Sequence, residues 1–185
     1  MGANFLLMKL HLRALKSFIY FTTLFLLLFG SPCPGEPAEL RKLKFYNTHT
    51  QERLEVYYRE GENYLPQAFK EINYILRDHR NGEIHPIDPK LLDFLYDLLE
   101  EVSFDGDVHI ISGYRSPESN IKLRKQSNGV ADRSLHLKGK ALDFRLPGID
   151  TKRLRDTALS MKRGGVGYYK RLDFIHIDTG RVRFW

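Results

Sequence analysis

Apolar residues follow helical periods mainly early in the chain and strand periods mainly late, and this order limits the fold class. Helical patterns cover 66–80, 88–102, 117–126 and 150–161, and strand patterns cover 44–47, 53–58, 108–111, 141–146, 166–169 and 174–179. Strands that cluster, instead of alternating regularly with helices, favour antiparallel pairing. The sequence therefore predicts an α+β fold, with a small antiparallel sheet that carries the functional site and packs against helices.

The first 35 residues are typical of an export segment. Lys9, Arg13 and Lys16 precede an apolar stretch of 13 residues at 18–30, which has signal-peptide length and is short for a membrane span. We expect 1–35 to be a signal peptide or an N-terminal anchor plus the start of a linker, and 42–185 to be the folded domain. Cys33 suggests lipid attachment, although Pro32 fits poorly before a lipidated cysteine. An exported, periplasmic protein is predicted, with membrane contact only through this segment.

Cys33 is the single cysteine of the 185-residue chain, so neither an internal disulfide nor a cysteine metal cluster can form. Any metal site must use His, Asp and Glu. Without the three basic residues of 1–35, 26 basic residues face 23 acidic ones, a net charge of +3. Nucleic-acid binding normally needs a clustered basic face, so we expect no nucleic-acid partner. A mildly basic body suits an anionic polymer such as a bacterial wall.

A carboxylate in the middle of an apolar strand is the first sign of a site. Alternation in 141–146 turns Leu142 and Phe144 toward the core and Asp143 away from it, beside the small Ala141. A buried carboxylate needs a partner. His136 precedes a turn at 138–139 that can fold its side chain back over the strand. A plain hydrogen-bonded pair and a metal site both fit this spacing.

The strand at 174–179 repeats the pattern, with His176 and Asp178 on the face opposite Ile175 and Ile177. If the two strands are neighbours, His136, Asp143 and His176 converge. Two imidazoles and one carboxylate suit zinc, and three protein ligands leave a fourth position for water, as in catalytic sites. Zinc lowers the pKa of that water to about 7. His109, alone on its strand, is interpreted as a surface residue.

Several segments resemble the M15 zinc peptidases, which include D-alanyl-D-alanine dipeptidases and carboxypeptidases. The run from Ser134 to Asp143 matches Ser-x-His-x-x-Gly-x-Ala-x-Asp, and Ser-Gly-Tyr-Arg-Ser at 112–116 precedes it in the family's order. The resemblance extends from about Leu43 to Trp185. Gly-Gly-Val-Gly-Tyr-Tyr at 164–169 and the terminal Arg-Val-Arg-Phe-Trp are similar to the murein endopeptidase K group of periplasmic proteins.

The resemblance implies one Zn²⁺ per chain, bound by His136, Asp143 and His176. It implies that Arg115 stabilises the oxyanion of the transition state, a role that suits a permanently charged guanidinium. Asp173, three residues before His176, holds the family's position for the general base, although strand alternation turns it to the opposite face. Asp178 is an alternative base or a partner that orients a histidine. Candidate substrate-binding residues are Ser134, Tyr168 and Tyr169.

The resemblance favours hydrolysis of peptide cross-links in peptidoglycan, between diaminopimelate residues or between D-alanine and diaminopimelate. Two alternatives stay open at this point. A D,D- or L,D-carboxypeptidase would trim free stem peptides, and a zinc-containing wall-binding module would keep the ligands without turnover. The expected partners are the stem peptides and cross-links themselves, and nothing in the sequence indicates a protein partner.

Overall fold

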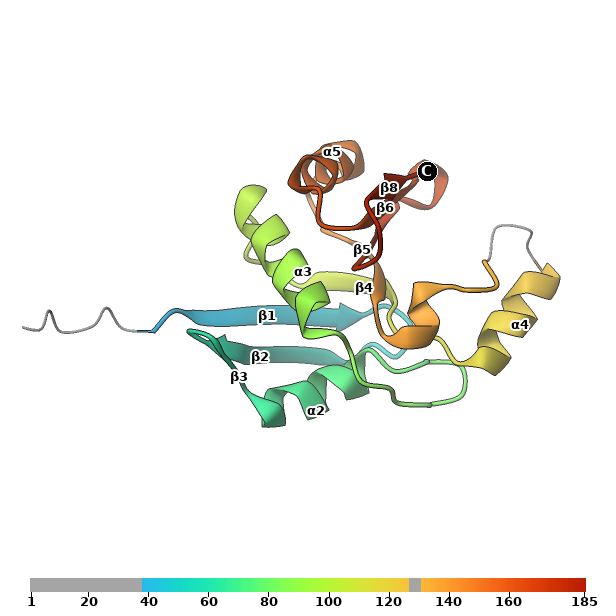
Figure 1. Ribbon diagram of the computed structural model, residues 1–185, viewed down its shortest axis with the longest axis horizontal. Coiled ribbons are helices and arrows are strands. Elements are labelled where there is room, and N and C mark those ends of the chain that lie inside the picture. The colour runs from blue at the N-terminus through green and yellow to red at the C-terminus, as the bar shows by residue number, and fades with distance from the viewer. Residues whose placement is uncertain (1–37, 127–130) are drawn as a thin grey trace, which may run out of the picture. The chain divides into compact units, whose positions relative to one another are not determined.

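The computed structural model describes residues 38–126 and 131–185, which form one eight-stranded sheet with helices packed against it (Figure 1). The strands are β1 (Leu40–Asn47), β2 (Arg53–Glu60), β3 (Asn63–Tyr64), β4 (Val108–Ser112), β5 (Ala141–Arg145), β6 (Gly165–Tyr169), β7 (Phe174–Asp178) and β8 (Arg183–Phe184). The helices are α2 (Pro66–Ile75), α3 (Pro89–Glu101), α4 (Pro117–Gln126) and α5 (Thr151–Met161), with 3₁₀ turns η1 (Leu135–Lys138) and η2 (Lys170–Leu172).

The strand order is β3-β2-β1-β4-β5-β7-β6-β8, and all neighbours are antiparallel except the pairs β1–β4 and β6–β8. The α+β class is confirmed, but the sheet is larger than the small one that we expected. The N-terminal hairpin joins the same sheet because β1 pairs in parallel with β4, which it reaches through α2 and α3. Strand β8 adds a second parallel pair at the other edge.

Alternation along the strands gives the sheet an apolar face and a polar face. Register places Phe45 beside Val108, Ile110 beside Phe144 and Leu142 beside Ile177, and all six residues are buried. They share one core with the apolar sides of α2, α3 and α5, which lie against β2, β1 and β6 respectively (Figure 1). The opposite face is left to carry the polar residues of β5 and β7.

Helix α2 ends five residues before the predicted end at Arg80. The carbonyl of Ile75 accepts a hydrogen bond from the Asn47 side chain (2.9 Å), and that of Leu76 accepts one from the Tyr114 amide (2.7 Å). Because these carbonyls accept hydrogen bonds from β1 and from the segment after β4, they do not accept the amide hydrogen bonds that would continue the helix. The chain then turns at 77–83 and brings Arg80 toward the functional site.

None of the helices within 38–126 and 131–185 is long and apolar enough to cross a membrane. The predicted signal or anchor segment, with Cys33, lies outside the described residues. The boundaries proposed from the sequence for that segment and for the folded domain therefore stay predictions.

Candidate active site

Three side chains from separate parts of the chain meet on the polar face of the sheet. Register places Asp143 of β5 directly beside His176 of β7, and η1 brings His136 over them. His176 Nδ1 lies 2.8 Å from Asp143 Oδ1 and 3.2 Å from His136 Nε2, and the distance from His136 Nε2 to Asp143 Oδ1 is 3.3 Å. The convergence expected from strand alternation is therefore present.

This donor set fits a divalent metal ion. A tetrahedral ion with bonds of about 2.0 Å holds its ligand atoms roughly 3.3 Å apart, close to the three distances found here. All three residues are buried, and together they form a group whose ligand atoms can hold one ion. Two imidazole nitrogens and one carboxylate oxygen are the donors that zinc accepts in catalytic sites.

The remaining nitrogen of each imidazole has a partner that fixes the ring. His136 Nδ1 lies 2.7 Å from the Gly113 carbonyl oxygen, and His176 Nε2 lies 3.0 Å from Asp178 Oδ2. With Nδ1 of His136 donating to the carbonyl, its Nε2 keeps a lone pair for the cluster. Such outer partners orient metal-binding histidines and raise their basicity.

Asp143 and His176 shift each other's pKa in the cluster. Burial acts to raise the pKa of Asp143, but His136 and His176 outweigh it and hold that pKa well below its usual range. Burial acts to lower the pKa of His176, but hydrogen bonds with Asp143 and Asp178 outweigh it and raise that pKa. Asp143 is therefore ionised at neutral pH and available as an anionic ligand.

Local backbone geometry explains how His136 reaches the sheet. Gly139 ends η1 in the left-handed conformation (φ 61°), and a Cβ at this position would lie 2.1 Å from the Pro86 carbonyl oxygen. Only glycine fits such a turn. The Arg115 amide donates to the His136 carbonyl (3.2 Å), so the Ser-Gly-Tyr-Arg segment holds both the backbone and the ring of this histidine.

The cluster lies in a cleft of about 630 Å³. Arg115 lines the cleft and is nearly buried, with Nη2 3.9 Å from Asp143 Oδ2 and Nη1 3.4 Å from the side-chain oxygen of Asn120. Its Nε finds no acceptor among the described residues. Arg115 therefore lies beside the cluster through its Nη2 group, while its Nε is buried. Ser134 and Tyr169 also line the cleft.

The C-terminal residues form a wall of the cleft that the sequence did not assign. Arg183 binds both oxygens of Asp178 (3.0 and 2.7 Å), which in turn contacts His176. The Trp185 indole lies 5.1 Å from the His176 ring, centroid to centroid. A Cβ on Gly167 would lie 2.7 Å from this indole, so the glycine makes room for it. The sequence signal for this wall is the i, i+2 spacing of Arg183 and Trp185, which places both side chains on one face of a strand.

Two of the predicted site residues lie elsewhere. Asp173 is exposed, has a left-handed backbone (φ 52°), accepts a hydrogen bond from the Thr151 hydroxyl of α5, and does not line the cleft. Tyr168 packs against the core under the Arg155 guanidinium, 4.6 Å from its ring centroid. The structure therefore brings neither side chain to the cluster.

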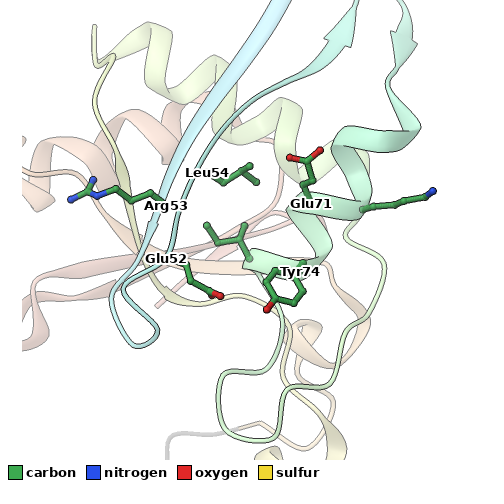
Figure 2. A pocket seen from close by; sticks show the side chains of 7 residues that line it. Glu52, Arg53, Leu54, Glu71 and Tyr74 are labelled. Carbon is green, nitrogen blue, oxygen red and sulfur yellow. The ribbon is translucent and has the colours of Figure 1, made fainter.

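A second hollow lies between β2 and α2, away from the cluster (Figure 2). Glu52, Leu54 and Tyr74 line it, together with Arg53, Lys70, Glu71 and Ile75. The Glu52 carboxylate is paired with Arg77 (2.9 Å). These seven lining residues include no histidine, so we place the candidate site in the cleft around His176.

Comparison with known proteins agrees with this geometry. A family model described as "Peptidoglycan L,D-endopeptidase MepK", of the M15 peptidases, matches residues 36–185. Proteins named peptidoglycan L,D-endopeptidase MepK from Escherichia coli (strain K12) and Shigella flexneri are 44% identical over 145 residues, 78% of this chain and 80% of theirs. A probable one from Haemophilus influenzae is 40% identical over 146 residues, 78% of each chain. The chain belongs to the MepK family of M15 metallopeptidases.

Proposed function

We propose that this protein is a zinc-dependent endopeptidase that hydrolyses L,D peptide cross-links in peptidoglycan. The observation that carries the proposal is the set of three converging donor atoms, 2.8 to 3.3 Å apart, in an open cleft. The names of the relatives support peptidoglycan as the substrate, and the chemistry of the donor atoms favours zinc. We assign one ion per chain to His136, Asp143 and His176.

The residues around the metal site would each have a separate role in the hydrolysis. Zinc, when bound, supplies a Lewis acid that polarises the scissile carbonyl and activates a water molecule. Gly113 and Asp178 hold the two imidazoles in orientation. Arg115 donates an Nη2 N–H to the carbonyl oxygen as negative charge develops there, and because the side chain is nearly buried, this stabilisation is little screened by water. Ser134 and Tyr169 would contact the peptide along the cleft.

We also propose that residues 1–35 direct export of the enzyme and that it acts in the periplasm. The family match begins at residue 36, directly after this segment, which supports a separate role for it. Its substrate, the wall, lies outside the cytoplasm.

The test of this function is product analysis on defined cross-linked muropeptide dimers. We expect mass spectrometry to show two monomers from each dimer, with activity abolished by a chelator and restored by zinc. Release of a single terminal amino acid from uncross-linked stems would indicate a carboxypeptidase instead. Zinc binding without turnover of any muropeptide would indicate a wall-binding module.

Asp178→Asn should weaken zinc binding. The amide removes the negative charge opposite His176 Nε2 and keeps the shape of the side chain. Loss of such an outer partner typically costs 10- to 100-fold in metal affinity, and we expect a loss in this range. Competition with a chromophoric chelator measures it. Wild-type affinity in this variant would show that Asp178 does not position His176.

Asp173→Asn makes the same chemical change five residues earlier and serves as the matched control. Because Asp173 faces Thr151 outside the cleft, we expect unchanged zinc affinity and a loss of activity below about threefold. A general base contributes roughly 10²- to 10⁴-fold. A drop of that size in kcat, with zinc still bound, would restore Asp173 as the base.

A further inference from the structure

Basic side chains outnumber acidic ones in the lining of the cleft around the cluster. Asp143 is the only Asp or Glu side chain among its lining residues, which include four arginines: Arg80, Arg115, Arg133 and Arg183. Three of these lie beside a carboxylate: Arg183 beside Asp178 (2.7 Å), Arg115 beside Asp143 (3.9 Å) and Arg80 beside Asp78 (3.6 Å). Arg80 and Arg133 are left as charges that the proposed mechanism does not use. A cleft with this balance favours an anionic ligand.

Arg80 is held in place by a buried carboxylate. Asp78 is fully buried and accepts hydrogen bonds from the Arg80 amide (3.0 Å), the Ser116 amide (2.9 Å) and the Ser116 hydroxyl (2.8 Å). Burial acts to raise the pKa of Asp78, but the bonds from Ser119, Ser116 and Arg80 outweigh it and lower that pKa to about 2. Asp78 therefore stays ionised at neutral pH and anchors the segment.

This anchor leaves most of the Arg80 guanidinium available. Nη1 of Arg80 lies 3.6 Å from Asp78 Oδ1, which is an ion pair without a hydrogen bond. The Arg80 side chain is 32% exposed to solvent. Within 38–126 and 131–185 its guanidinium makes no hydrogen bond, since Asp78 is already engaged by backbone and hydroxyl donors. The guanidinium can therefore offer its forked N–H groups to a ligand in the cleft.

The histidine next to Arg80 adds no charge at neutral pH. The His79 ring stacks on the His49 ring, with centroids 3.8 Å apart and planes 10° apart. Burial, followed by the charges of Arg80 and His49, lowers the pKa of His79 to about 4, so this imidazole is neutral at pH 7. Asp78 also bonds Ser116, the residue after Arg115, so Arg80 and Arg115 are anchored to the same group.

We propose that Arg80 forms an anion subsite that binds a free carboxylate on the residue next to the scissile amide. The inference rests on the proposed function and adds a specificity-determining residue to it. Diaminopimelate is a dicarboxylic acid, so a residue that contributes its amine to a cross-link keeps a carboxylate on the same carbon. A guanidinium fork binds a carboxylate through two parallel hydrogen bonds, which selects it over a neutral amide.

The test compares two defined cross-linked dimers that differ only in this carboxylate, which is free in one and amidated in the other. We expect wild-type enzyme to have a lower KM for the free acid. Arg80→Gln should raise KM for the free acid about tenfold or more, with kcat retained, and should change KM for the amidated dimer by less than about threefold. Arg80→Lys keeps the charge without the forked N–H groups, and its KM for the free acid should lie between those of wild type and Arg80→Gln.

Arg133→Gln is the matched control, because it removes the same charge from the same cleft. We expect it to change KM for both dimers by one common factor. Equal effects of Arg80→Gln on the two dimers, or a selective loss in Arg133→Gln, would overturn the subsite. So would a wild-type enzyme that does not distinguish the dimers, a result independent of how any variant folds. Failure of wild-type enzyme to cut either dimer would instead overturn the proposed function.

Discussion

His176→Ala is expected to lose both the metal ion and the activity. The substitution removes one of three ligands and leaves only Asp143 and one imidazole to bind the ion. Because the ion supplies several kcal/mol of transition-state stabilisation, hydrolysis of cross-linked dimers should fall by at least about 10³-fold. Metal content after dialysis and the initial rate of dimer cleavage measure the two losses.

His109→Ala is the matched control for this variant. His109 lies on β4, where its ring packs 4.9 Å from the Tyr46 ring and does not line the cleft. We expect full metal content and activity within about twofold of wild type. If His176→Ala kept its zinc and its rate while folded, as judged by circular dichroism, the assignment of His176 as a ligand would be wrong.

Arg115→Gln is expected to lower kcat by about 10²- to 10³-fold, the usual cost of removing a donor from an oxyanion site. The variant should keep its zinc, because Arg115 lies 3.9 Å from Asp143 and is not itself a ligand. KM should change little, since the stabilised charge exists only in the transition state. Steady-state kinetics on cross-linked dimers, with metal content measured in parallel, test both statements.

Arg124→Gln provides the comparison for Arg115, because it removes an arginine charge from the exposed side of α4. A kcat close to that of wild type is expected. Should Arg115→Gln release the metal ion, its role would be structural. Should it keep the ion and raise only KM, Arg115 would bind the substrate in its ground state and would not stabilise the oxyanion.

The metal cluster could be predicted because its parts are encoded locally. Alternation fixes the faces of Asp143 and His176 within two short strands, and the turn at Gly139 returns His136 toward them. What the sequence left conditional was the pairing of β5 with β7, a contact between strands 33 residues apart at Asp143 and His176. The family resemblance implied that His136, Asp143 and His176 bind one ion, and the structure shows the pairing.

The parts that escaped prediction depend on distant contacts or on single backbone conformations. The end of α2 depends on Asn47 and Tyr114, which take the carbonyls of Ile75 and Leu76. The same early end brings Arg80 to the cleft. Asp173 matches the spacing of a base, yet its left-handed backbone turns the carboxylate toward Thr151. Strand β8 has two residues, too few for a recognisable period.

Zinc-edge X-ray absorption on the purified, zinc-loaded protein tests the central claim most directly. We predict one zinc per chain with nitrogen and oxygen neighbours at about 2.0 Å, two of them imidazole nitrogens, and no sulfur. A shell with sulfur, a shell with one or four imidazoles, or a protein that retains no zinc would contradict the assignment of His136, Asp143 and His176.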